Sequence, residues 1–174
     1  MNKKVWDLYA PVYEKAMRTD RKVYQYMYDR IPQIILGKEV LEIATGPGLL
    51  AKHVAGAAAL PYKDDSFDVV LIANALHVMP NPEKALSEID RVLRPGGVLI
   101  APNFVAHKGT FISRIWSGIL QIAGISFEHQ WSAEGYQDFL RQNGWEIQHS
   151  QEMQARIAIV YTECVRKRGE ANGS

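Results

Sequence analysis

The chain has 174 residues, 47% of them hydrophobic, which is enough for one domain with a sizeable core and too few for two. Twenty Lys and Arg against nineteen Asp and Glu leave a formal net charge of +1, so charge gives no argument for a nucleic-acid partner. The single cysteine, Cys164, excludes an intramolecular disulfide. Its apolar neighbours predict a buried structural thiol in a reducing compartment.

The N-terminal stretch MNKKVWDLYAPVYEK lacks the apolar run of a signal peptide, and no stretch reaches the roughly 18 apolar residues of a membrane span. We therefore expect a cytoplasmic protein without a membrane span. Cys and His residues show no metal-ligand spacing, so we expect no metal.

Residues 1–36 carry apolar side chains at near-helical spacing, which predicts two helices, broken near Pro11 and ended around Pro32. The run EVLEIA then predicts a short strand, TGPG a tight turn, and LLAKHVA a helix. The core is therefore expected to begin as strand, glycine turn and helix.

The run FDVVLIANAL is almost continuously apolar and predicts a strand covered on both faces. Asn81 and Pro82 predict the start of a helix, RPGG its end, and VLIAPNF the next strand. Ser132 is expected to cap a helix that Gly144 closes, and WEIQHS and ARIAIVYTECV to pair as a hairpin. This alternation predicts an α/β fold with a parallel sheet, whose ligands bind beyond the carboxyl ends of the strands.

Gly46 and Gly48 flank Pro47 directly after the first strand, so the backbone can turn tightly and approach a ligand. With Ala51 they match the spacing of dinucleotide sites, which leaves open a structural turn, a nicotinamide or flavin site, or another nucleoside cofactor. Glu42 favours the last of these, because a carboxylate inside an apolar strand is costly unless a cationic ligand pairs with it. The loop ALPYKDDS stands where a dinucleotide fold needs a second strand and its acid, which weakens that interpretation.

Three stretches together resemble the class I S-adenosylmethionine-dependent methyltransferases: VLEIATGPGLLAKHVA, ALPYKDDSFDVVLIANALHVMPNPEKALSEIDRVLRPGGVLI and the terminal strand pair. The group that they resemble is the small-molecule enzymes related to the ubiquinone and menaquinone C-methyltransferases. The resemblance runs from about Glu39 to Val165, and LPYKDDSFD followed by LRPGG carries it more specifically than the glycine turn. It implies a Rossmann-like sheet, S-adenosylmethionine as cofactor with S-adenosylhomocysteine as product, and methyl transfer to an apolar small molecule.

The resemblance also implies which positions hold the cofactor. They come from the N-terminal segment, the first strand and its turn, the following loop and the end of the next strand: Tyr9, Tyr13, Glu42, Ala44, Gly46, Gly48, Leu60, Asn74, Ala75 and Leu76. The glycine-turn positions would contact the methionine part, Leu60 would border the adenine, and Asn74 to Leu76 would form the floor near the sulfonium. For the two tyrosines, core packing is the alternative.

Two histidines follow predicted strand ends and are the candidate catalytic bases, His77 first and His107 second. A hydrogen-bonded structural histidine fits the same positions. A base is needed only when the methyl acceptor has a proton to lose.

The whole chain, 1–174, is interpreted as a single domain with an N-terminal helical cap at 1–36 and an α/β core at 37–168. Residues 108–131 are aromatic-rich and stand where this family inserts a substrate lid. They fit a lid, a partner-binding surface or a membrane-binding surface, and we expect a lid over a hydrophobic small molecule.

The chain departs from the family pattern at two points. Ala44 replaces the first glycine of the turn, which is a mild change. The second departure is larger, because Gly48 and Leu60 are separated by only eleven residues. The family places there a second strand with a ribose-binding acid, a helix and a third strand, which need roughly 35 residues. We therefore expect a reduced sheet without a ribose-binding strand.

Three explanations remain open: the sequence omits a mobile stretch, it carries a deletion, or the natural sheet is reduced. The junction KHVAGAAALPY has no new turn residues, which favours the first two. Without the missing strands EVLEIA becomes an exposed apolar edge, so we expect it to pair with another chain, as in a homodimer, or to be covered by residues 1–36. The functional alternatives are a non-catalytic methyltransferase-like module that self-associates through this edge, and a nucleotide-binding oxidoreductase.

Overall fold

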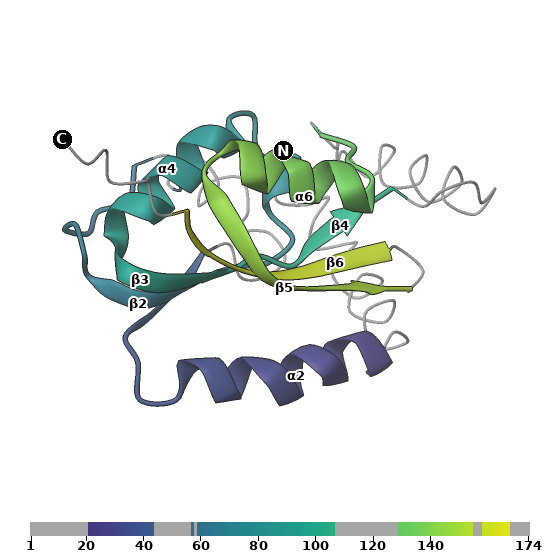
Figure 1. The fold of residues 1–174 in the computed structure, drawn as a ribbon, viewed down its shortest axis with the longest axis horizontal. Helices are drawn as coiled ribbons and strands as arrows, with labels where there is room; N and C mark the ends of the chain where they lie inside the picture. The colour runs from purple at the N-terminus through teal and green to yellow at the C-terminus, as the bar shows by residue number, and fades with distance from the viewer. Residues whose placement is uncertain (1–20, 44–56, 58, 107–128, 155–157, 168–174) are drawn as a thin grey trace, which may run out of the picture.

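A computed structural model describes residues 21–43, 57, 59–106, 129–154 and 158–167 of the chain. Helices and strands follow one another along this part. The elements in chain order are α2 (Arg21–Ile35), β1 (Val40–Ile43), β2 (Phe67–Ile72), the short 3-10 helix η1 (Leu76–Val78), α4 (Pro82–Val92), β3 (Leu93–Ile100), β4 (Asn103–Val105), α6 (Ala133–Gln142), β5 (Trp145–Met153) and β6 (Ala158–Arg166). Helix α2 lies on one face of the sheet, and α4 and α6 lie on the other (Figure 1). The α/β fold class is confirmed.

The strands form one six-stranded sheet in the order β1-β2-β3-β6-β4, with β5 on the other edge of β6. β1, β2 and β3 are parallel, and helix α4 connects the last two. β6 runs antiparallel to β3, β4 and β5, so the predicted C-terminal hairpin of β5 and β6 is confirmed. The parallel strands point their carboxyl ends to one side of the molecule, where the rule for α/β sheets places a ligand.

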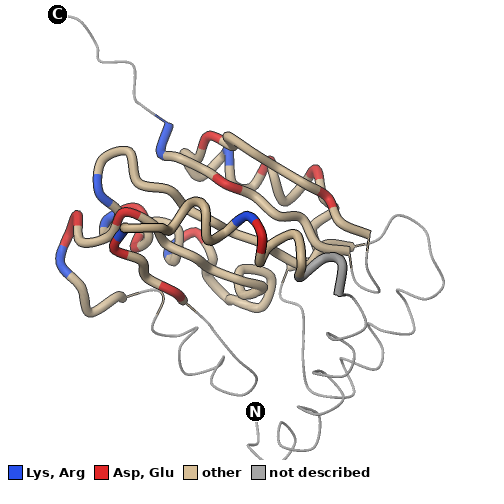
Figure 2. Tube along the Cα trace, turned by 90° about the horizontal axis from the view of Figure 1, so that it is seen from below, with Lys and Arg blue, Asp and Glu red and all other residues tan. Residues whose placement is uncertain are grey.

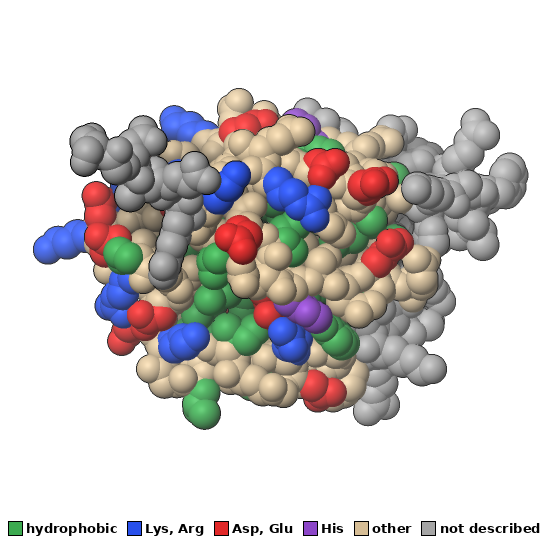
Figure 3. Space-filling view, in the orientation of Figure 1, with side chains coloured by type: hydrophobic (Ala, Val, Ile, Leu, Met, Phe, Trp, Pro, Cys, Tyr) green, Lys and Arg blue, Asp and Glu red, His purple; other side chains and the backbone are tan. Residues whose placement is uncertain are grey.

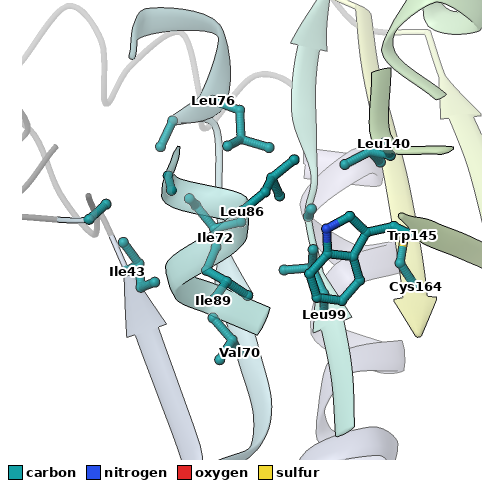
Figure 4. Packing of buried hydrophobic residues seen from close by; sticks show 14 of the residues in the cluster. Ile43, Val70, Ile72, Leu76, Leu86, Ile89, Leu99, Leu140, Trp145 and Cys164 are labelled. Atoms are coloured by element: carbon teal, nitrogen blue, oxygen red, sulfur yellow. The ribbon is translucent and has the colours of Figure 1, made fainter. Parts of the chain in front are cut away.

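The larger core lies between the sheet and helices α4 and α6. Residues 43, 70 and 72 of the sheet meet Leu86 and Ile89 of α4, and Trp145 packs near Leu99, Leu140 and Cys164 (Figure 4). Ile89 and Leu140 are 0% exposed and Trp145 is 1% exposed. This face is the main apolar support of the fold.

Helix α2 covers a smaller cluster on the opposite face. Met27 of α2 packs with Val69, Ile100, Ile159 and Tyr161, one side of three neighbouring strands. The cluster takes every second residue of these strands, as the two-residue period of a strand requires.

The α4 and α6 helices begin where the sequence predicts. Pro82 is the first residue of α4, although the Asn81 side chain makes no capping bond. Ser132 Oγ accepts a hydrogen bond from the Gly135 amide at the start of α6. Gly144, with φ 83°, follows the end of α6 in the left-handed conformation that glycine adopts most easily.

Helix α2 continues through Pro32, which corrects the prediction that it ends there. The helix runs on to Ile35, and Ile34 and Ile35 pack against the sheet cluster. Pro32 itself is exposed, and the neighbouring Gln33 side chain donates to the Asp29 carbonyl at 2.8 Å. Packing of the last turn therefore outweighs the cost of the missing proline N–H.

The RPGG segment follows the end of α4, as predicted, but it already belongs to a strand, so the strand predicted at VLIAPNF begins earlier. β3 starts at Leu93, directly after the last residue of α4. Gly96 has φ 80°, and a Cβ at Gly97 would lie 2.9 Å from the Arg94 carbonyl oxygen and 3.1 Å from that of Asp68. The two glycines thus let the chain leave the helix and pair closely with β2 at once.

The predicted strand VLIAPNF is divided in two. β3 pairs with the second half of β6 and β4 pairs with its first half, with Ala101 and Pro102 between them. Pro102 has no N–H for a ladder bond, so the strand breaks there. The break lies at the carboxyl end of β3.

β1 stands at the end of the strand order among the described residues, as the reduced sheet predicts. Two of its side chains are exposed to solvent: that of Val40, which is 36% exposed, and that of Glu42. Residues 21–36 therefore do not cover this edge, because α2 packs on the face of the sheet. Residues 1–20 lie outside the described part of the chain, and pairing with another chain stays a prediction.

Charged residues of both signs are interspersed along the described chain. Figure 2 shows basic and acidic positions next to one another on the trace, and Figure 3 shows the same mixture on one face. Several of them are paired, including Arg141 with Asp138 and Arg166 with Asp90. Surface pairs of this kind stabilise a fold only slightly.

Candidate functional site

Most of the described candidate residues follow strand β2, whereas Glu42 lies in β1 and Leu60 precedes β2. Of the predicted set, the structure describes Glu42, Leu60, Asn74, Ala75, Leu76 and His77. Tyr9, Tyr13, Ala44, Gly46, Gly48 and His107 lie outside the described residues, so their proposed roles stay predictions. The helix predicted after the glycine turn also lies outside the described residues. So do residues 107–128, which include most of the predicted lid.

Asn74 follows β2 in a left-handed backbone conformation. Its φ is 50°, which is uncommon for a residue other than glycine, and its N–H donates to the Pro102 carbonyl at 2.8 Å. This bond joins the end of β2 to the break between β3 and β4. The Asn74 Oδ1 atom is buried and has no hydrogen-bond partner in the described part of the chain. A buried acceptor without a partner is costly, so this atom marks a place where a ligand or water donates.

Ala75 and Leu76 lie in the apolar core. Ala75 is 0% exposed and Leu76 is 1% exposed, and both belong to the cluster around α4. Leu76 points into the group of side chains from β2 and α4 (Figure 4). The two side chains therefore support the backbone turn from below, and any contact that they offer to a ligand comes from their backbone.

His77 is a buried, neutral histidine. Its ring is 3% exposed, and its Nδ1 lies 3.0 Å from Asn103 Oδ1. Burial is the main reason that the pKa of His77 is lowered to about 4. The hydrogen bond to Asn103 raises this pKa by a smaller amount, and the nearby His129 lowers it further. The ring also meets Phe104 edge-on, with centroids 5.4 Å apart. His77 is thus uncharged at neutral pH and shielded from bulk water.

Asn103 was not predicted from the sequence as a site residue. It is 0% exposed, and its Nδ2 donates to the Phe104 carbonyl at 3.0 Å. The only signal in the sequence is an amide inside the otherwise apolar run VLIAPNF. Such a residue needs buried partners, but nothing local indicates that one of them is His77.

The backbone beside Asn103 is held from two elements. Tyr136 of α6 and Thr162 of β6 both donate side-chain hydroxyls to the Ala101 carbonyl, each at 2.9 Å. The Ala101 N–H donates in turn to the Thr162 carbonyl at 2.9 Å. These bonds fix the β3–β4 break, so the position of Asn103 is set by rigid elements.

The described end of the predicted lid, residues 129–131, closes the other side of this group. The His129 N–H donates to the His77 carbonyl at 3.0 Å, and the Ala106 N–H donates to the Trp131 carbonyl at 2.8 Å. The His129 and Trp131 rings stack, with centroids 4.9 Å apart and planes at 5°. His129 Nε2 is buried without a hydrogen-bond partner in the described part of the chain. We call His77, Asn103 and His129, together with Asn74, the strand-end cluster.

Arg94 of the LRPGG motif pairs with Asp68 of LPYKDDSFD, and the start of LPYKDDSFD is held by Arg91. Its guanidinium donates to the carbonyls of Leu60 and Tyr62 and to the carboxylates of Asp64 and Glu88. The Glu88 carboxylate also accepts the Leu60 N–H at 2.9 Å. Its bond to Arg91 holds the pKa of Glu88 at about 2. Leu60, the proposed adenine neighbour, is therefore fixed to helix α4 and is half-buried against the core.

Glu42 is exposed, which corrects the argument that its carboxylate is costly within an apolar strand. It sits on β1 beside Leu71 of β2, and β1 is the last strand of the described sheet. Water therefore solvates the carboxylate, and its presence in β1 does not by itself require a cationic partner. Its contact with the cofactor stays a prediction.

Cys164 is buried, as predicted. Its residue is 0% exposed, and burial raises the pKa of its thiol to about 12. The thiol is therefore protonated and structural.

The described residues include neither a metal-binding cluster nor a membrane-spanning helix. No group of three or more His, Cys, Asp or Glu side chains among them is arranged to hold a metal ion. Within the same ranges, no helix combines the length and the apolar character needed to cross a membrane.

The chain matches a sequence family described as a methyltransferase domain, over residues 26–101. It is 28% identical to the ubiquinone/menaquinone biosynthesis C-methyltransferase UbiE of Geobacter sulfurreducens over 131 residues, which is 73% of this chain and 50% of that protein. It is 29% identical to the mitochondrial 2-methoxy-6-polyprenyl-1,4-benzoquinol methylase of Rattus norvegicus, over 58% of this chain and 34% of that protein. The chain thus spans half or less of the length of these relatives.

Solved structures share the fold. A methyltransferase of Thermotoga maritima, described as a possible histamine N-methyltransferase, superposes with a TM-score of 0.68 at 18% identity, covering 95% of this chain and all of that one. A methyltransferase of Bacillus halodurans gives a TM-score of 0.56 at 16% identity, covering 76% of this chain and 92% of that one. At these identities the likeness concerns the fold alone. The domain match and the quinone-type relatives show that this chain is similar to the class I S-adenosylmethionine-dependent methyltransferases, in particular to the ubiquinone and menaquinone enzymes, and the solved structures share their fold.

Proposed function

We propose that this protein transfers a methyl group from S-adenosylmethionine to an apolar small-molecule acceptor. Members of the family use this cofactor. The observation that carries the proposal is the strand-end cluster, in which buried polar groups gather beyond β2 and β3 in an otherwise apolar core. Ligands of parallel α/β sheets bind at this edge.

The described residues fit the cofactor at one place in particular. Asn74 Oδ1 is a buried acceptor that lacks a protein partner in the described ranges, at the position where the family forms the pocket floor. When bound, the cofactor supplies a methyl group on a positively charged sulfur, and an amide oxygen stabilises such a charge without a formal negative charge. Glu42 at the end of β1 and Leu60, held by Arg91 and Glu88, are the other described residues proposed to bind it.

An apolar acceptor is proposed from the surroundings of the cluster and from the relatives. Phe104 and Trp131 lie against the rings of His77 and His129. Two relatives are named for ubiquinone and menaquinone biosynthesis and for a polyprenyl benzoquinol. Methyl transfer is an in-line displacement, so the protein has mainly to align the reacting atoms and keep them dry. A cytoplasmic location and the lid role of residues 108–131 belong to the same proposal.

The affinity for the cofactor is expected to be modest. The eleven residues between Gly48 and Leu60 contain no Asp or Glu that could grip the ribose. Charge-assisted hydrogen bonds contribute about 1.5 to 3 kcal/mol each, so their loss weakens binding markedly. The domain match and the quinone-type relatives favour an enzyme over the non-catalytic module.

Titration calorimetry with S-adenosylhomocysteine tests the proposal. Micromolar binding supports it, absence of heat supports the non-catalytic module, and a preference for a nicotinamide cofactor supports the oxidoreductase. Asn74→Gly removes the unpartnered oxygen while keeping the backbone conformation easy, and it should weaken binding about ten-fold. Asp65→Gly is the matched control, because Asp65 has φ 51° in an exposed loop. Equal affinities of the two variants would contradict the role of Asn74.

A further inference from the structure

The outer edge of β1 is the end of the sheet among the described residues. β1 stands last in the strand order, and two of its four residues, Val40 and Glu42, are exposed. Helix α2 packs on the face of the sheet, against residues of β2, β3, β5 and β6. An open strand edge presents main-chain N–H and C=O groups with which another strand can pair.

The backbone bonds of Glu39 show which residues face this edge. Its N–H and its carbonyl both bond to residues of β2, at 2.9 Å to the Asp68 carboxylate and at 3.2 Å to the Val69 N–H. Main-chain groups point to alternate sides along a strand, so those of every second residue face β2. The N–H and C=O groups of Val40 and Glu42 therefore point away from β2, to the open edge.

The charges along this edge are complementary to themselves. Lys38 stands two positions before Val40, Glu42 stands two positions after it, and all three are exposed. If two copies meet around a twofold axis at Val40, their strands run antiparallel, and each Lys38 lies opposite the Glu42 of the other copy. An axis at Glu39 or Glu42 would place carboxylates opposite one another. An axis at Leu41 would leave each Glu42 opposite Val40.

We propose that β1 pairs with β1 of a second copy of this chain, in an antiparallel ladder centred on Val40. The two Val40 residues exchange N–H···O bonds, and each Glu42 N–H donates to the Lys38 carbonyl of the other copy. The Lys38 N–H is not needed, because it donates to the Ile35 carbonyl at 3.1 Å within its own chain. Each copy uses the same edge, so the assembly stops at two.

This pairing goes beyond the proposed function and does not depend on it. A dimer of this kind continues one sheet through both copies and removes the exposed edge of each, whether or not the chain transfers methyl groups. The edge is short, since β1 has only four residues. Stable interfaces bury about 1,600 Å² in total, so this contact should form a weak, reversible dimer with a Kd on the order of 0.1 mM at low salt.

Sedimentation equilibrium of the cofactor-free protein tests the pairing; the cofactor is left out because Glu42 is also proposed to bind it. The average mass should rise from 19.6 kDa toward twice that value between about 1 μM and about 1 mM. Lys38→Glu alone or Glu42→Lys alone should raise Kd at least about ten-fold, because like charges then lie opposite each other. An equimolar mixture of the two variants should dimerise about as well as the wild type, because each strand then faces the opposite charges.

Lys84→Glu and Glu146→Lys are the matched controls. They make the same charge changes at exposed positions of α4 and β5, and should leave Kd unchanged, as should their mixture. Far-UV circular dichroism checks that each variant is folded.

Hydrogen exchange measures the ladder itself. The Val40 and Glu42 amides should exchange more slowly as the protein concentration rises, whereas the Leu41 amide, which faces β2, should not change. A wild type that stays monomeric throughout the range would overturn the proposal. A dimer that neither charge reversal weakens, or that the mixture does not restore, would overturn it as well. Failure of the proposed function would show separately, as absence of S-adenosylhomocysteine binding in calorimetry.

Discussion

The two faces of the sheet differ in whether a buried acid or base keeps its charge. On the α4 and α6 side, burial keeps such groups neutral: it lowers the pKa of His77 to about 4, raises that of Cys164 to about 12 and raises that of Tyr136 well above its usual value. On the α2 side Glu163 stays charged because Arg30 pairs with it through two hydrogen bonds, although burial also raises the pKa of the neighbouring Tyr161.

The α2 side holds its charges through direct hydrogen bonds. Burial alone would raise the pKa of Glu163, but bonds from Arg30 and Tyr161 outweigh it and hold that pKa below its usual value. Tyr26 adds a bond of 2.6 Å to His149 Nε2. Specific polar contacts thus fasten α2 to the smaller apolar cluster, whereas the opposite face depends on apolar packing and leaves its neutral polar groups at the strand ends.

The largest effect is expected from the apolar face. Ile89→Ala removes a side chain that is 0% exposed between α4 and the sheet, and should lower the free energy of unfolding by about 3 to 4 kcal/mol. Urea denaturation measures the loss. Leu36→Ala, at a side chain that is 85% exposed, is the control and should change stability by less than about 0.5 kcal/mol. Similar values for both variants would contradict the assignment of the main core to this face.

The neutral His77 predicts a pH dependence of stability. The folded pKa of His77, about 4, lies below the ordinary histidine value of 6.5, so the unfolded chain binds more protons between these pH values. The contribution of His77 to the free energy of unfolding is therefore fully present above pH 6.5. It is lost as the pH is lowered to about 4, by about 3 kcal/mol in total. Denaturation at pH 7 and pH 4.5 should show a smaller loss for His77→Gln than for the wild type. An equal loss in both proteins would show that the ring is not held neutral by folding.

The paired face should respond to the loss of one partner. Arg30→Met leaves the Glu163 carboxylate, 8% exposed, with only the Tyr161 bond, and should cost about 2 kcal/mol. Adding Glu163→Gln removes the unpaired charge and should recover at least half of that loss, as measured by a double-mutant cycle. Strictly additive losses would mean that the pair does not fasten α2.

The smallest effect is local and concerns the Arg91 contacts. Arg91→Met releases the loop of residues 60–66 from α4. Hydrogen exchange at the Leu60 amide, which donates a hydrogen bond to the Glu88 carboxylate, should therefore become faster. Arg141→Met is the matched control, because Arg141 forms the same i,i+3 pair at the end of α6. Exchange at Leu60 that is unchanged by Arg91→Met would exclude this role for Arg91.

Local patterns predicted most of the fold. β2, the starts of α4 and α6 and the β5–β6 hairpin follow from apolar runs, caps and turn residues that act over a few positions. The errors arose where tertiary packing overrides such signals. α2 passes through Pro32 because its last turn packs on the sheet, and β3 begins before the predicted strand VLIAPNF because two glycines allow close pairing.

The candidate site was predicted in part. The order of the motifs placed Asn74 and His77 at the end of a core strand, where the structure has them. The Glu42 carboxylate was expected to need a cationic partner, but it is exposed, because β1 has no outer neighbour among the described residues. Asn103 was missed, because its partner His77 lies 26 positions earlier in the chain.

The sequence alone determined the fold class, the resemblance to the methyltransferase family and the buried, inert state of Cys164. These follow from periodicity, motif order and the polarity of near neighbours, which act over short stretches of the chain. Only the tertiary structure decided that His77 is buried and neutral and that Glu42 meets water. Both depend on which distant residues exclude solvent from a group or bond to it, and a linear pattern does not contain that information.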